Sequence, residues 1–144
     1  MAIDIRVIRP KDFLRTHADG NLDMMGSLDL LREIAREVKR AAIRHVLIDT
    51  RGARSDLNTS DLYVLAERFA MDADLARATV VLLVPEQRID KAHFLTVVAD
   101  NRGAHARAFA NFENAIDWLS WTRIPTRMQR TRVDSGGWMT RPWR

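Results

Sequence analysis

The positions of apolar and polar residues along the chain predict alternating strands and helices. Residues 3–8 place isoleucine or valine at every second position, which is typical of a strand with one buried face. Residues 45–49 and 79–84 instead hold uninterrupted apolar runs, as in central parallel strands that are buried on both faces. The predicted strands cover residues 3–8, 13–19, 45–49, 79–84 and 105–110.

Helical spacing appears between these strands. Leu28, Leu31, Ala35 and Val38 recur every three or four residues, and charged residues fill the opposite face. The predicted helices run from Asp23 or Ser27 to about Ala42, from Thr59 to about Ala70, from Asp90 to Asn101 before a left-handed cap at Gly103, and from Phe112 to about Leu119.

This order of elements predicts the fold class. Helices that alternate with strands favour an α/β fold with a mostly parallel sheet. The first two strands follow each other across a turn at Pro10, so we expect an antiparallel edge hairpin strand. We therefore expect about five strands and about four helices, in one domain over residues 1–120 with an extension over residues 121–144.

Composition excludes several classes of function. With 47% hydrophobic and 29% charged residues, the chain resembles a soluble globular domain. The absence of cysteine excludes disulfides, thiolate nucleophiles and iron–sulfur clusters. The first residues have the pattern of a strand, and no apolar run approaches the roughly 20 residues of a membrane span. The four histidines lack metal-ligand spacing. We expect a cytoplasmic protein without a cofactor or metal.

Positive charge is concentrated in the extension. Residues 121–144 carry six arginines and one aspartate, a net charge of +5, while the whole chain carries +4. The first 120 residues are thus nearly neutral, and a nucleic-acid-binding face on the domain is not expected. Arginine combined with tryptophan suits acidic surfaces or an interface. The extension therefore predicts salt-sensitive binding of nucleic acid or membrane, docking on a second copy of the chain, or a disordered extension without such a role.

A polar stretch at residues 49–61 contains the signals of a helix start. Asn58 is placed to cap a helix, with Asp61 as the reciprocal acidic partner of a capping box. Leu57 and Leu62 stand at the spacing of a hydrophobic staple. These signals explain much of the stretch without a functional site.

The next strand-to-helix junction predicts the same arrangement. Asp90 would cap the helix, and Ile89 would form a staple with Phe94. Both helices then begin at the carboxyl ends of the central strands. Open parallel sheets bind their ligands there.

The remaining polar residues of these two junctions suit an anion. Thr59 and Ser60 fall in the first helical turn, where free N–H groups and the helix dipole favour negative charge. Arginines on both loops can pair with a phosphate, and solvated loop charges are the alternative interpretation. The predicted anion-binding or ligand-binding residues are Arg51, Arg54, Asn58 and Arg88.

The polar stretch also resembles a known family. A strand that ends in Asp49, followed by Gly52 and by hydroxyl residues that open a helix, is similar to the pattern of the anti-sigma-factor antagonist (STAS) domain. More closely, VLIDTRGARSDLNTSDLYVLAERFA, VPEQRIDKAHFLTVVADNRG and RAFANFENAIDWL resemble, in this order, the bacterial SpoIIAA-like family of single-domain proteins. The resemblance covers about residues 1–120 and implies a STAS-type fold.

The resemblance implies binding or regulation more than catalysis. In anti-sigma-factor antagonists the phosphoacceptor serine follows an aspartate and precedes a glycine. The matching place here reads LNTSD, without the glycine and with the added charge of Asp61. Ser60 is the first candidate phosphoacceptor and Thr59 the second. The resemblance therefore implies a non-enzymatic regulatory module that engages an unidentified protein partner around these two residues.

Two alternatives stay open. A small anionic or amphipathic ligand would bind at the carboxyl ends of the central strands, and a pocket there with Arg51 or Arg88 would favour it. A hydrolase or lyase would use Asp49 or Asp56 as a base, although no nucleophile is placed with a histidine partner.

Overall fold

The computed structural model describes residues 2–8 and 13–121 of the 144-residue chain. All but the first residue of the predicted extension lies outside these ranges, together with the nucleic-acid, membrane and self-association contacts expected of it. Within the described ranges, no helix combines the length and the apolar content that crossing a membrane requires.

Six strands among the described residues form one sheet. The strand order is β1-β2-β3-β5-β6, and the two-residue β4 pairs with β2 outside this path. β2, β3, β5 and β6 are parallel to one another, and β1 runs antiparallel to β2 with Ile5 opposite Thr16. The strands are β1 (Ala2–Ile8), β2 (Phe13–Asn21), β3 (His45–Asp49), β4 (Ala53–Arg54), β5 (Thr79–Leu83) and β6 (His105–Phe109).

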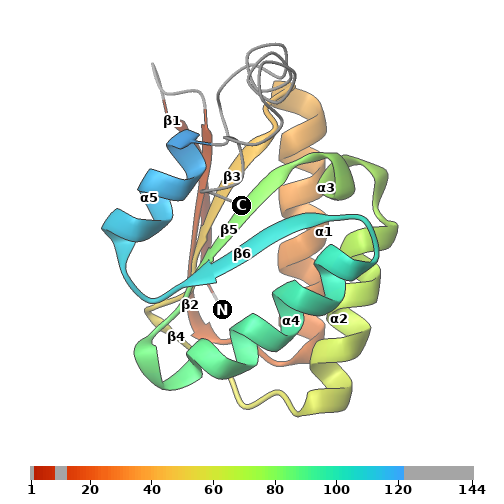
Figure 1. Cartoon of the computed structure of the whole chain (residues 1–144), viewed down its shortest axis with the longest axis vertical. Helices are drawn as coiled ribbons and strands as arrows, with labels where there is room; N and C mark the ends of the chain where they lie inside the picture. Colours follow the sequence, from red (N-terminus) through yellow and green to blue (C-terminus); the bar gives the residue numbers. More distant parts are fainter. Residues whose placement is uncertain (1, 9–12, 122–144) are drawn as a thin grey trace, which may run out of the picture.

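Helices cover both faces of the sheet. Figure 1 shows α5 on one side of the sheet and α1, α2 and α4 on the other. The short α3 packs against α1 and α2. The helices are α1 (Met24–Ala41), α2 (Thr59–Met71), α3 (Ala73–Arg77), the 3-10 helix η1 (Glu86–Arg88), α4 (Ile89–Asn101) and α5 (Phe112–Trp121).

The predicted fold class is wrong in several details. The described residues hold five α-helices instead of about four, because Asp72 ends α2 and caps the separate α3 through the amides of Asp74 and Leu75. They also hold the unpredicted β4. Every pairing from β2 onward is parallel. The turn of the predicted edge hairpin lies in residues 9–12, outside the described residues, so the structure describes only the antiparallel pairing of β1 with β2.

Apolar clusters of the core lie on both faces of the sheet. Val46 and Val80 point toward α1–α4, while their neighbours Leu47 and Val81 point toward α5. Successive residues of a strand alternate between faces. The two continuous apolar runs are therefore explained by helices on both sides.

The predicted start of α2 is confirmed. Asn58 Oδ1 accepts the amide N–H of Asp61 at 2.8 Å, and Asp61 Oδ2 accepts the amide N–H of Asn58 at 3.2 Å. Leu57 and Leu62 are buried in one cluster with Leu65. The capping box and staple thus fix where the loop ends and the helix begins.

The predicted start of α4 is wrong. The chain passes from Pro85 through η1 directly into the helix, so Asp90 lies inside the first turn and the N-cap residue, Arg88, makes no side-chain capping bond. Ile89 packs beside Val84, and Phe94 is 37% exposed. A 3-10 turn already satisfies the first amides and removes the need for a side-chain cap. At the other end, Gly103 has the positive φ, +104°, expected of it.

The capping box leads to a stability prediction. We expect Asn58→Ala to lower the free energy of unfolding by about 1 kcal/mol, because the Asp61 amide loses its acceptor. Ser60→Ala removes an exposed hydroxyl from the same turn and should change it by less than about 0.5 kcal/mol. Urea unfolding followed by circular dichroism measures both values. Equal losses would contradict the assigned cap.

Candidate functional site

The loop between β3 and α2 turns sharply past the end of β2. A Cβ atom on Gly52 would lie 2.7 Å from Asp19 Oδ1, so the loop passes close to this carboxylate. Asp19 is an exposed side chain that can turn aside, so a larger residue at position 52 would displace it from its contact with His17.

Asp49 ends β3 as a buried carboxylate that pairs with the exposed guanidinium of Arg51. Asp49 is only 2% exposed. Its Oδ1 accepts Nε–H of Arg51 at 3.1 Å and its Oδ2 accepts Nη2–H at 3.0 Å, and Oδ1 also accepts the Arg51 amide at 3.0 Å. Burial acts to raise the pKa of Asp49, but these hydrogen bonds and the arginine charge outweigh it and hold the pKa below its usual range. Asp49 is thus an ionised structural anchor and a poor general base.

His17 joins this ion pair from the neighbouring strand. Its Nε2 lies 3.0 Å from Asp19 Oδ1 and its Nδ1 lies 3.8 Å from Asp49 Oδ2. The guanidinium of Arg51 lies 6.0 Å from the centre of the Phe112 ring, at the start of α5. The cluster therefore belongs to the α5 side of the sheet.

Thr59, Ser60 and Arg54 are all exposed. The described contacts give the two hydroxyls no partner and bring none of the predicted arginines to them. Asp56 is exposed in the same loop. The predicted residues are thus distributed over two faces of the sheet, with Arg51 on the α5 side and Arg88 on the α2 side.

A pocket opens between the sheet and three helices, at the carboxyl ends of β3 and β5. Its volume is about 110 Å³, of the same order as an apolar cavity of about 150 Å³ that holds benzene. No Asp, Glu or His lies among the described residues that line it. Its apolar wall includes Leu30, Ile48, Leu62, Leu65, Phe69 and Leu82.

Two cations line the pocket where it meets solvent. Arg88 donates from Nη1 to the carbonyl oxygen of Ala53 at 2.8 Å and from Nη2 to that of Thr50 at 2.8 Å. Lys91 Nζ donates to the carbonyl oxygen of Leu57 at 2.9 Å. Burial lowers the pKa of Arg88. Both charges therefore face neutral acceptors in the described contacts.

Lys91 was not among the binding residues predicted from the sequence, although its position at a helix start is unusual for a cation. Arg88 and Lys91 stand at the N-terminal end of α4, where the helix dipole disfavours cations. Cations in that position indicate another partner, here the carbonyl oxygens of the preceding loop. No group of three His, Cys, Asp or Glu side chains within the described ranges is arranged to hold a metal ion.

The comparisons with known proteins agree with this architecture. No family model and no curated protein matches the chain. Among solved structures, a serine-to-glutamate variant of RsbS from Moorella thermoacetica is 17% identical, with a TM-score of 0.56 over 85% of this chain and 97% of its own. The unphosphorylated anti-sigma factor antagonist SpoIIAA is 15% identical, with a TM-score of 0.50 over 82% of this chain and 97% of its own.

These likenesses define the class of the domain. The chain has a SpoIIAA-like, STAS-type α/β fold, as the sequence resemblance implied. At these identities the likeness establishes the fold alone, so the function has to be argued from the residues of this chain.

The ion pair between Asp49 and Arg51 predicts that part of the stability depends on pH. We expect Asp49→Asn to lower the free energy of unfolding at pH 7 by about 2 kcal/mol, because charge-assisted hydrogen bonds are lost. A lowered carboxyl pKa stabilises the fold above the unfolded-state pKa, near 3.9, and this contribution disappears as the pH falls through the folded-state value. The difference between the two proteins should therefore shrink below about pH 4.

Asp29→Asn is the matched control for this substitution. Asp29 pairs with Arg32 at 2.7 Å on the exposed side of α1, and such surface pairs contribute about 1 kcal/mol or less. Urea unfolding at pH 7 and pH 3 compares the three proteins. A pH-independent loss in Asp49→Asn, or a loss equal to that of the control, would refute the structural role of the pair.

Proposed function

We propose that this protein is a non-enzymatic regulatory module that engages a protein partner through the outward face of α2. We define this face as Thr59, Ser60, Val64 and Met71. The proposal rests on the composition of this face, in which exposed hydroxyls are followed along the helix by apolar side chains that are exposed to solvent. Val64 is 39% exposed and Met71 78%.

The helix itself does not require these residues. The cap uses Asn58 and Asp61, and the buried side of α2 uses Leu62 and Leu65. Ser60, Val64 and Met71 are separated by four and seven residues, so they lie on one side of the helix, with the exposed Arg68 between Val64 and Met71. An exposed stripe with large apolar side chains is typical of an interaction surface.

Control by phosphorylation is the finer part of the proposal. A phosphate on Ser60 would lie at the start of a 13-residue helix, where free amides and the dipole stabilise negative charge. The carboxylate of Asp61 accepts the amide N–H of Asn58 and keeps its negative charge, so the stabilisation from the helix start has to exceed its repulsion of the phosphate. The likeness to an anti-sigma factor antagonist supports a regulatory role.

The outward face can be tested by capturing partners from the native cell. We expect Val64→Asp to reduce partner binding at least about tenfold, because a charge would enter the apolar centre of the interface. Lys39→Asp reverses a charge on exposed α1 and should leave binding unchanged. Both variants are checked by circular dichroism and quantified by affinity capture with mass spectrometry. The same partners at the same yield from Val64→Asp would rule out this surface.

Binding of a small anionic, amphipathic ligand is a second candidate function. The pocket beside α2 supports it, because an apolar wall is combined with the cations Arg88 and Lys91. This is the combination that the carboxylate and the hydrocarbon part of an amphipathic acid require. A volume of about 110 Å³ suits a ring or a short chain.

A series of carboxylates tests this second function. Affinity should rise from butanoate to hexanoate, by about 0.8 kcal/mol for each buried methylene, until the pocket is filled. Arg88→Gln should weaken hexanoate binding about tenfold because a charged hydrogen bond is lost, whereas Arg54→Gln, outside the pocket, should not. Calorimetry measures these affinities. Affinities independent of chain length would exclude the pocket as the site.

A further inference from the structure

We propose that an anionic ligand in the pocket strengthens partner binding at the outward face of α2, by fixing the loop at residues 50–58 and the start of the helix. This coupling rests on the two functions proposed above and adds a link between them. The connecting elements are α2 itself and the two cations that hold the loop.

The helix α2 contributes to both the pocket and the outward face. Leu62, Leu65 and Phe69 point from α2 into the pocket, while Ser60 and Val64 lie on its exposed side. Residues three or four apart on a rigid helix move together. If a ligand fills the pocket behind these inward side chains and α2 shifts, the outward face of α2 therefore shifts as well.

Hydrogen bonds from Arg88 and Lys91, at the beginning of α4, hold the start of α2. Lys91 binds the carbonyl oxygen of Leu57, the residue before the cap, and Arg88 binds those of Thr50 and Ala53. In Figure 1 this loop and the beginning of α4 lie together at the lower end of the molecule. The loop position thus depends on where these two cations are held.

Arg88 and Lys91 both have N–H groups that the described hydrogen bonds do not use. A guanidinium has five N–H groups and an ammonium three, and the described bonds of Arg88 and Lys91 use only part of them. Their acceptors are uncharged, unlike the carboxylate that neutralises Arg51. An added anion therefore gains charge-assisted hydrogen bonds without displacing the loop carbonyls.

The consequence follows from thermodynamic linkage. A ligand carboxylate that bridges Arg88 and Lys91 immobilises both side chains while they hold the loop, and its apolar part packs against Leu62 and Leu65. The described position of α2 becomes more populated. A partner that recognises this position then binds more tightly, and it raises the ligand's affinity by the same factor.

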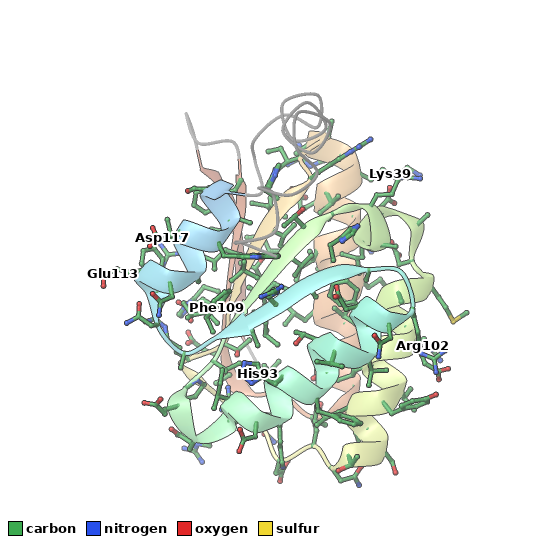
Figure 2. All side chains as sticks on the ribbon, viewed as in Figure 1. Lys39, His93, Arg102, Phe109, Glu113 and Asp117 are labelled. Carbon is green, nitrogen blue, oxygen red and sulfur yellow. The ribbon has the colours of Figure 1, made fainter. Side chains whose placement is uncertain are left out.

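The C-terminal end of α4 offers an internal reference. Arg102, labelled in Figure 2 at the end of α4, donates to the hydroxyl of Tyr63, and its guanidinium lies 5.0 Å from the centre of the ring. It also lies 3.5 Å from Glu67. These contacts connect α2 to α4 outside the pocket, so Arg102→Gln loosens the same pair of helices without touching the ligand.

Hydrogen exchange on the full chain tests the coupling, with hexanoate as the probe. Saturating hexanoate should slow the exchange of the amides at residues 59–66 by about fivefold or more, the lower range of allosteric coupling. Amides of α5 should be unaffected. In Lys91→Gln the slowing should be lost, whereas in Arg102→Gln it should persist. Hexanoate should raise the affinity for the partner, and the partner should raise the affinity for hexanoate by the same factor.

The possible failures are distinguishable. If hexanoate binds and α2 exchange does not change, the coupling is wrong and the ligand function stands. If hexanoate does not bind at millimolar concentration, both the ligand function and the coupling are wrong, while partner capture through Val64 is unaffected. If Lys91→Gln retains the slowing, the loop tie is not the connection and the proposal fails.

Discussion

The hydrogen bonds from Arg88 to the carbonyl oxygens of Thr50 and Ala53 are the contact on which the candidate site depends. Backbone carbonyls beside a core require partners, and here they come from the next strand-to-helix connection. The tie sets the position of the loop, and the capping box of Asn58 and Asp61 then sets where α2 starts. The pocket, its cations and the outward face of α2 all follow from that position.

The two strand-to-helix junctions place their charges on opposite faces of the sheet. Arg51 turns toward α5 and is neutralised by the buried carboxylate of Asp49. Arg88 and Lys91 lie on the other face and meet only neutral acceptors in the described contacts. The charge of Arg51 on the α5 side therefore stabilises the fold, whereas the charges of Arg88 and Lys91 on the α2 side remain able to bind an anion. This difference in pairing, more than the number of arginines, distinguishes an anchor from a binding group.

Local patterns predicted much of the fold. The two uninterrupted apolar runs gave β3 and β5 because helices bury both faces, and the cap at Asn58 was readable because its partners lie within three residues. The five-residue α3 is too short to show a period. The 3-10 turn after Pro85 replaced the expected cap at Asp90. The bond from Lys91 to Leu57 spans 34 positions, so no local pattern contains it.

The central claim is that a partner contacts the outward face of α2. Amide chemical-shift mapping of the full chain, titrated with the captured partner, tests it most directly. The account predicts the largest changes between Thr59 and Met71, with smaller changes in the loop before them. Changes concentrated on α5 or on the exposed side of α1, with α2 unaffected, would contradict it.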